Sequence, residues 1–354
     1  MKILHVMISP RGEGTPRMVL DWLKVKGHEQ ELVFLEPAGT LLPEFEATGA
    51  WMYVNRDFPL RFTAGMKVLR LVKKISNERK PDLVISWPMG FSQWIHLGAR
   101  MAGVKKLIVH AGNPPGSSFF HKYVSTYLSF WTGYLVGNKV ITCSNYLIDK
   151  FNRIPFLSRE QFICVYNCFR PERFMLNGVA KDPNQAIMVA TLEDHKDHKT
   201  LLHAWRIIED GGHPFTLKLA GDGSMKQELL SLHAELKLRQ VEFLGSRSDV
   251  PELLNRSKLF VFSTTIQEGF GTVLLEALAS RCKVVASDVP ACREVLKDGK
   301  YGMLIEPANA QMLAKSIIDA MLSPDNENTV NEGVAYAAQF SPERMLNQYL
   351  EIVR

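Results

Sequence analysis

The chain has 354 residues, 46% of them hydrophobic, and a mean hydropathy of −0.06. That length exceeds the range over which one hydrophobic core keeps growing, which predicts two domains. No apolar run reaches the length needed to span a bilayer. The five cysteines form no CxxC pair, which favours the reduced thiols of a cytoplasmic protein over a disulfide framework or a zinc site. The net charge of +5 is uneven, because residues 1–170 hold 22 Lys+Arg and 12 Asp+Glu, a balance of +10.

Short apolar segments alternate with longer segments of helical periodicity along the whole chain. Strands that are buried on both faces show this pattern when helices cover a parallel sheet. The run 1–8 lacks a small-residue cleavage site and is interpreted as the first strand of such a sheet. The strands are expected at 2–9, 31–35, 51–54, 82–86, 106–110, 139–143, 162–165, 185–190, 215–220, 241–244, 259–263, 283–287 and 303–305.

The alternation is interrupted near 166–171, where one array of strands ends and a second begins. We therefore expect an N-terminal domain at 1–170 and a C-terminal domain at 171–335, each a Rossmann-like, doubly wound α/β domain. A last helix is expected within 336–354, and the pattern alone allows it to pack on either domain.

The first turn of the chain follows a strand, precedes a helix and contains Gly12 and Gly14. It matches the dinucleotide-binding fingerprint only in part, because Arg17 stands where the third glycine is needed. Glycines at this point would still let the backbone approach a diphosphate closely. The alternative is an ordinary strand–helix turn.

His110 ends the expected strand 106–110. Ligands of open parallel sheets bind at the carboxyl ends of the strands, which makes this histidine a candidate site residue. The alternative is a structural histidine.

Two segments of the first half are candidates for binding an acceptor. Residues 66–80 predict an amphipathic helix with a strongly basic face, which indicates either membrane docking or an ordinary solvated surface. Residues 119–136 carry aromatic side chains at helical spacing, which indicates either core packing or a wall that contacts a sugar or lipid. Nucleic acid is not expected as a partner, because no known nucleic-acid-binding signature is present.

Two glutamates, Glu268 and Glu276, stand eight residues apart, with a Gly-Phe-Gly turn just after the first. A predicted strand leads into this segment, and an apolar helix runs out of it. A helix between them would place both carboxylates on roughly one face. Glycines allow backbone amides to approach a ligand, and a helix N-terminus favours anions. Because carboxylates accept hydrogen bonds from sugar hydroxyls, this cluster could hold a sugar, a ribose and a phosphate. The alternative is a solvated helix start.

This segment resembles the glutamate–seven residues–glutamate signature of family-4 retaining glycosyltransferases. The similarity is strong over about 186–320 and weaker, but continuous, over 1–185. It implies the GT-B fold, in which two Rossmann-like domains face each other across a cleft and the last helix crosses back to the N-terminal domain. Matching segments outside the signature are 217–223, 241–245, 283–290, 293–295 and 302–305.

The resemblance also implies roles for single residues. Glu276 would hold the ribose hydroxyls, and Glu268 would hold sugar hydroxyls and phosphate together with the amides of Phe270 and Gly271. Lys196 would stabilise charge on the leaving diphosphate, and His110 would contact the transferred sugar. The catalytic residues expected are His110, Lys196 and Glu268. The donor-binding residues expected are Gly12, Gly14, Thr191, Lys196, Gly221, Arg247, Glu268, Phe270, Gly271, Thr272 and Glu276.

The sequence departs from the family pattern at Thr191, where the family has an arginine that neutralises the donor diphosphate. A neutral hydroxyl cannot replace a planar, bidentate cation. A compensating cation could come from Lys199 or from the first domain, for example Arg11 or Arg17. His195 and His198 lack a matching carboxylate cluster, so no metal is expected.

The sequence therefore predicts a retaining glycosyltransferase that transfers a hexose from a nucleotide-diphosphate sugar to a glycan, glycolipid or small-molecule acceptor. Uridine diphosphate is the favoured carrier, and no cofactor is expected. The enzyme would be cytoplasmic, with possible peripheral contact to the inner face of a membrane. The alternatives are a nucleotide-sugar epimerase or dinucleotide oxidoreductase of similar fold, and a non-catalytic subunit that binds nucleotide sugars.

Overall fold

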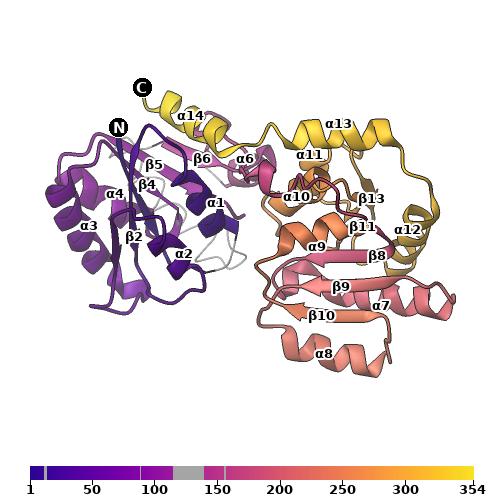
Figure 1. The fold of residues 1–354 in the computed structure, drawn as a ribbon. Helices are drawn as coiled ribbons and strands as arrows, with labels where there is room; N and C mark the ends of the chain where they lie inside the picture. The colour runs from indigo at the N-terminus through magenta and orange to yellow at the C-terminus, as the bar shows by residue number, and fades with distance from the viewer. Residues whose placement is uncertain (12–13, 88, 115–138, 155–156) are drawn as a thin grey trace. The chain divides into compact units, whose positions relative to one another are not determined.

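The computed structural model describes residues 1–11, 14–87, 89–114, 139–154 and 157–354 (Figure 1). The chain divides into a first unit, Met1–Cys168 with Pro342–Arg354, and a second unit, Phe169–Ser341. Each unit is built around its own parallel sheet with helices on its faces, which confirms the predicted doubly wound α/β class. Gly12 and the aromatic segment 119–136 cannot be compared with their predictions, because Gly12 and residues 115–138 lie outside the described residues.

The sheet of the first unit has the strand order β3-β2-β1-β4-β5-β6-β7 among the described residues, and its neighbouring strands are parallel. Alternate side chains of strand β1 point to opposite faces of the sheet. Ile3 and Met7 pack in a cluster with Trp22 and Tyr349, whereas Leu4 packs in a separate cluster on the other face. The strands are β1 (Lys2–Met7), β2 (Glu29–Phe34), β3 (Met52–Val54), β4 (Leu83–Ser86), β5 (Lys106–Ala111), β6 (Lys139–Thr142) and β7 (Phe162–Cys164).

The helices of the first unit cover both faces of this sheet. The paired helices α3 and α4 supply Val68, Val72 and Ile95 to one core cluster, while α1 and the C-terminal α14 supply Trp22 and Tyr349 to the other. The α-helices are α1 (Gly14–Trp22), α2 (Leu42–Glu46), α3 (Gly65–Arg79), α4 (Ser92–Met101), α6 (Asn145–Asn152) and α14 (Pro342–Ile352). Among the described residues, no helix has the length and apolar character needed to cross a membrane.

The sheet of the second unit has the order β10-β9-β8-β11-β12-β13 and is also parallel (Figure 1). Its strands are β8 (Asp182–Val189), β9 (Thr216–Ala220), β10 (Val241–Gly245), β11 (Ser257–Phe262), β12 (Lys283–Ser287) and β13 (Met303–Ile305). Its α-helices are α7 (His198–Asp210), α8 (Lys226–Glu235), α9 (Val250–Arg256), α10 (Thr272–Ala279), α11 (Pro290–Val295), α12 (Ala310–Leu322) and α13 (Glu327–Ala337). The first residues of α10 follow directly from the loop that leaves β11.

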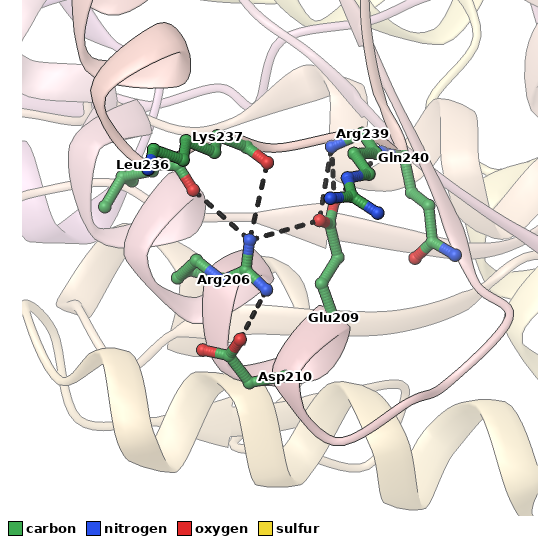
Figure 2. A network of polar contacts seen from close by, with 7 residues as sticks. All are labelled: Arg206, Glu209, Asp210, Leu236, Lys237, Arg239 and Gln240. Carbon is green, nitrogen blue, oxygen red and sulfur yellow. Dashed lines mark hydrogen bonds and ion pairs between the residues drawn. The ribbon is translucent and has the colours of Figure 1, made fainter.

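A polar network joins the end of α7 to the connection between α8 and β10 (Figure 2). The Glu209 carboxylate accepts hydrogen bonds from the backbone amides of Arg239 and Gln240, with Oε1 at 2.9 Å from both nitrogens. Arg206 donates to the carbonyl oxygens of Leu236 and Lys237, at 3.2 and 3.4 Å. This network therefore satisfies backbone groups that the end of α8 would otherwise leave unpaired.

Replacing Glu209 with alanine should lower the free energy of unfolding by about 2–4 kcal/mol, because two backbone amides lose their acceptor in a place where the glutamate side chain is only 6% exposed. Asp210 is the matched control, since it bonds to the same Arg206 but is 67% exposed. Its replacement by alanine should leave stability almost unchanged. Urea unfolding of both variants measures the difference, and equal effects would contradict this account of the network.

Candidate functional site

A buried ion pair connects two loops at the carboxyl ends of β8 and β11. The Lys196 ammonium donates to Glu268 Oε2, and the two side chains are 15% and 10% exposed. Glu268 Oε1 accepts from the amides of Gly269, at 3.0 Å, and Phe270, at 3.4 Å. Burial raises the pKa of Glu268, but the Lys196 charge and the amide hydrogen bonds outweigh burial and hold the pKa below its usual range. The site thus contains a charged carboxylate beside a charged ammonium.

Backbone hydrogen bonds fix these two loops to each other. The His195 carbonyl oxygen accepts from Thr264 Oγ1 and from the Thr265 amide, each at 3.0 Å. Lys196 ends a short 3₁₀ helix, and the next residue, Asp197, adopts a left-handed conformation with φ of 41° and caps α7 through its side chain. The Lys196 ammonium is 5.1 Å from the centre of the Phe262 ring. The backbone around Lys196 is therefore held by contacts on both sides of the residue, and the ammonium itself contacts Glu268 and the Phe262 ring.

Gly221 is needed because the loop after β9 approaches the loop after β8 very closely. A Cβ atom at Gly221 would lie 1.9 Å from the Ala190 carbonyl oxygen, so only glycine fits. The Glu193 carboxylate accepts from the Ser224 amide at 3.0 Å and from Ser224 Oγ at 2.7 Å, and these bonds lower its pKa. Thr191 is half-buried within this packed segment.

The second glutamate of the pair lies in α10, which begins only at Thr272, after Gly271 with φ of 82°. Glu276 is half-buried, although its neighbours Leu275 and Ala277 are fully buried. The expectation of one helix between the two glutamates is wrong, because Glu268 precedes the helix in an irregular loop. Their eight-residue separation is therefore not a spacing along one helical face.

Two other predicted donor-binding residues have contacts of their own. The Phe270 ring is 2% exposed and packs 6.3 Å from the Phe340 ring, while its amide donates to Glu268. Arg247 is exposed and forms two hydrogen bonds with Asp249, at 2.7 and 2.6 Å. The structure thus brings Lys196, Glu268 and Phe270 together, and it pairs Arg247 with a different carboxylate.

In the first unit, His110 is a buried residue near the end of β5, with 1% of its surface exposed. Its Nδ1 lies 2.7 Å from the hydroxyl of Tyr349 in α14, and its ring centre is 4.9 Å from that of Trp87. Burial lowers the pKa of His110 to about 3, so the ring is neutral near pH 7. Sequence reasoning missed Tyr349, since 239 residues separate the two partners and no local pattern signals the contact. Gly14, the first residue of α1, is exposed.

No group of three or more His, Cys, Asp or Glu side chains suited to a metal ion occurs within the part of the chain that the structure describes. The ion pair supplies the second unit with a carboxylate and an ammonium at this position. A carboxylate accepts hydrogen bonds from hydroxyl groups, and an ammonium stabilises phosphate oxygens.

Residues 170–336 match the family model described as glycosyl transferases group 1. The second unit resembles a group 1 glycosyltransferase domain. This match covers slightly less than half of the chain and includes Lys196, Glu268 and Glu276.

Curated relatives agree with this match. The chain is 26% identical over 228 residues to an uncharacterized glycosyltransferase from Methanocaldococcus jannaschii. The aligned region covers 64% of the chain and 59% of the relative. It is 26% identical to a Campylobacter jejuni N-acetylgalactosaminyltransferase whose name specifies a diphospho-undecaprenol substrate, over 66% of the chain and 65% of the relative. The putative glycosyltransferase EpsF of Bacillus subtilis is 26% identical over 81% of the chain and 79% of its own length. The chain spans less than two thirds of the first two relatives.

Solved structures establish the fold. HepE from Anabaena, crystallised with UDP and glucose, superposes with a TM-score of 0.84 at 21% identity and 99% coverage of both chains. A glycosyltransferase from Rickettsia africae gives a TM-score of 0.80 at 19% identity, with 99% and 97% coverage. WaaG, a glycosyltransferase involved in lipopolysaccharide biosynthesis, gives 0.73 at 16% identity, with 99% coverage of both chains. The chain has the GT-B fold.

Proposed function

We propose that this chain is a retaining glycosyltransferase of family 4 that transfers a sugar from a UDP-sugar to a glycan, glycolipid or small-molecule acceptor. The observation that carries the proposal is the Lys196–Glu268 pair, held beside the start of α10 within the segment that matches the group 1 glycosyltransferases. Structures of HepE with UDP and with UDP-glucose support the choice of carrier.

The two charges of the pair fit complementary tasks in this reaction. The Glu268 carboxylate is ionised and accepts hydrogen bonds from sugar hydroxyls. As the bond between the sugar anomeric carbon and the phosphate oxygen breaks, negative charge grows on the leaving diphosphate, and the Lys196 ammonium stabilises it. The acceptor oxygen forms the new bond to the anomeric carbon on the same face, and its proton passes to the leaving phosphate. No metal or cofactor takes part in this scheme.

The family has an arginine and a lysine where this chain has Thr191 and Lys196. Lys196 is therefore the cation that the second unit supplies at these two positions. Each of the candidate compensating cations already has a carboxylate partner: Lys199 is 2.5 Å from Glu228, Arg17 is 2.7 Å from Glu44, and Arg11 is 3.9 Å from Glu36. Lys196 has a carboxylate partner too, but it stands at a cation position of the family pattern, so we infer that it carries most of the charge stabilisation.

A thermal-shift screen of nucleotide sugars tests the proposal. A ligand present at 100 times its dissociation constant stabilises a protein by about 2.7 kcal/mol. UDP and at least one UDP-sugar should raise the melting temperature in the presence of a chelator, whereas NAD should not. Stabilisation by NAD alone would contradict the proposal and favour an oxidoreductase.

We further propose that the acceptor is lipid-linked and that the first unit docks on an anionic membrane surface. Met66, Lys67, Arg70 and Lys74 are exposed on α3, and 48% of the Met66 surface is accessible to solvent. Basic residues near an anionic surface contribute about 1 kcal/mol each. The undecaprenol-linked substrate in the name of the Campylobacter jejuni relative supports this choice.

Flotation with vesicles tests the membrane contact. The protein should float with vesicles that contain anionic lipid at low salt and should be released at high salt, because salt screens exposed charges. The triple variant Lys67→Glu, Arg70→Glu and Lys74→Glu should not float, whereas the control Lys24→Glu with Lys26→Glu, also exposed in the first unit, should. Failure of the wild-type protein to float would leave a soluble acceptor as the better proposal.

A further inference from the structure

The Glu268 carboxylate occupies a set of hydrogen-bond donors that would suit a phosphate group. Its Oε2 accepts from the Lys196 ammonium, and its Oε1 accepts from the backbone amides of Gly269, at 3.0 Å, and Phe270, at 3.4 Å. An ammonium and successive backbone amides are also the groups with which proteins bind phosphate oxygens. The carboxylate therefore sits where an anionic ligand could sit, and it belongs to the protein itself.

Burial leaves an incoming anion little access to this ammonium. The side chains of Lys196 and Glu268 are only 15% and 10% exposed, and the centre of the Phe262 ring lies 5.1 Å from the ammonium. Two anions that share one buried ammonium would also repel each other, because a buried site is screened less than water. A diphosphate can therefore contact this ammonium closely only if the carboxylate moves aside.

The Glu268 side chain lies in a segment that allows such a movement. No helix or strand lies between Phe262, the end of β11, and Thr272, the start of α10. Gly269 follows Glu268 directly and brings no side chain that would hold it in place. The backbone around Lys196, in contrast, is bonded on both sides of the residue. Rotation of the glutamate side chain alone would thus separate the two charges.

Thr191 makes the competition for this ammonium stronger. The family pattern has an arginine there, which would give a diphosphate a cation separate from the lysine. In this chain the two matched positions supply one positive charge, and Glu268 already neutralises it. A diphosphate placed there would compete directly with Glu268.

We propose that Glu268 is an internal competitor of the donor diphosphate: it occupies Lys196 and the neighbouring amides in the free protein, and a bound diphosphate displaces it. The proposal rests on the function proposed above, in which Lys196 faces the diphosphate. The displaced carboxylate regains hydrogen bonds only when the ligand carries hydroxyl groups beyond its diphosphate, as a nucleotide sugar does and UDP does not. Glu268 therefore weakens binding of the product UDP more than binding of the donor.

Calorimetry of Glu268→Gln tests the competition, with UDP, UDP-glucose and inorganic pyrophosphate as ligands. The substitution keeps the size of the side chain and removes its charge, so UDP and pyrophosphate should bind about tenfold more tightly than they bind the wild type. UDP-glucose should gain less, because its sugar hydroxyls already compensate the displaced carboxylate in the wild type. Asp194→Asn is the matched control, since Asp194 is an exposed residue of the same 3₁₀ helix as Lys196. It should bind all three ligands as the wild type does.

Each outcome of this titration decides one part of the account. Unchanged or weaker binding of pyrophosphate and UDP by Glu268→Gln would overturn the proposal. An equal gain in Asp194→Asn would overturn it as well, because general charge repulsion would then explain the effect. A gain for UDP-glucose as large as that for UDP would show that Glu268 does not select between donor and product. If Glu268→Gln binds pyrophosphate more tightly while neither protein binds UDP, the internal competitor is supported and the proposed function fails.

Crystal structures of the wild type with and without UDP test the displacement without any substitution. The free protein should show the ion pair between Lys196 and Glu268. In the complex, a phosphate oxygen should replace Glu268 Oε2 at the ammonium, and the two side chains should be more than about 4 Å apart, beyond ion-pair distance. An intact ion pair with UDP bound beside it would contradict the proposal and leave the proposed function in place.

Discussion

Replacing Lys196 with alanine should reduce the turnover of a nucleotide sugar by about 100-fold or more. Removal of one preorganised donor that faces charge developing in a transition state has an effect of this size. Because Thr191 stands where the family has an arginine, no second cation at that position can stabilise the leaving diphosphate in place of Lys196. Steady-state kinetics should show the loss mainly in kcat, since the charge that Lys196 stabilises is largest in the transition state.

The same substitution leaves the buried Glu268 carboxylate without its partner, which should cost about 3–5 kcal/mol of stability. A control must therefore separate unfolding from lost chemistry. The double variant Lys196→Ala with Glu268→Gln removes the uncompensated charge and should recover most of the stability while remaining inactive. If either variant turns over the donor at a near-normal rate, another cation stabilises the leaving group and the assignment of Lys196 is wrong.

Replacing Glu276 with alanine should weaken binding of UDP and of UDP-sugars. The variant loses the acceptor for two ribose hydroxyls, and each hydrogen bond to a charged group contributes about 1.5–3 kcal/mol. Loss of even one bond corresponds to a rise in Kd of roughly 10- to 150-fold. Isothermal titration calorimetry measures the change.

Glu235→Ala is the matched control for this prediction, since Glu235 is an exposed glutamate at the end of a helix of the same unit. It should bind UDP as the wild type does. A folded Glu276→Ala variant with undiminished affinity for UDP would rule out the ribose contact.

The sequence was sufficient to predict the fold class and the approximate position of the strands. Strands such as 83–86 and 259–262 are apolar on both faces because helices cover both sides of a parallel sheet, and that pattern is local. Gly221 was expected only as a donor-binding residue, and the close approach of its backbone to Ala190 was not predicted.

Side-chain contacts between distant segments could not be predicted in the same way. Lys196 and Glu268 were each expected to belong to the site, but their ion pair spans 72 residues and depends on loop geometry. The helix expected between the two glutamates begins only at Thr272, because Gly271 before it adopts a left-handed backbone conformation. The contact of Tyr349 with His110 arises only once α14 packs beside α1 in the first unit.

The most direct test of the account is proton NMR of a UDP-sugar incubated with the protein and a panel of saccharide and polyprenyl-linked acceptors. The account predicts that UDP appears together with a new glycosidic anomeric signal of the same configuration as the donor sugar. The appearance of an epimerised nucleotide sugar without release of UDP would contradict it and identify an epimerase. Tight binding of the UDP-sugar with neither UDP release nor a new anomeric signal would contradict it as well, and would identify a subunit that binds nucleotide sugars without catalysis.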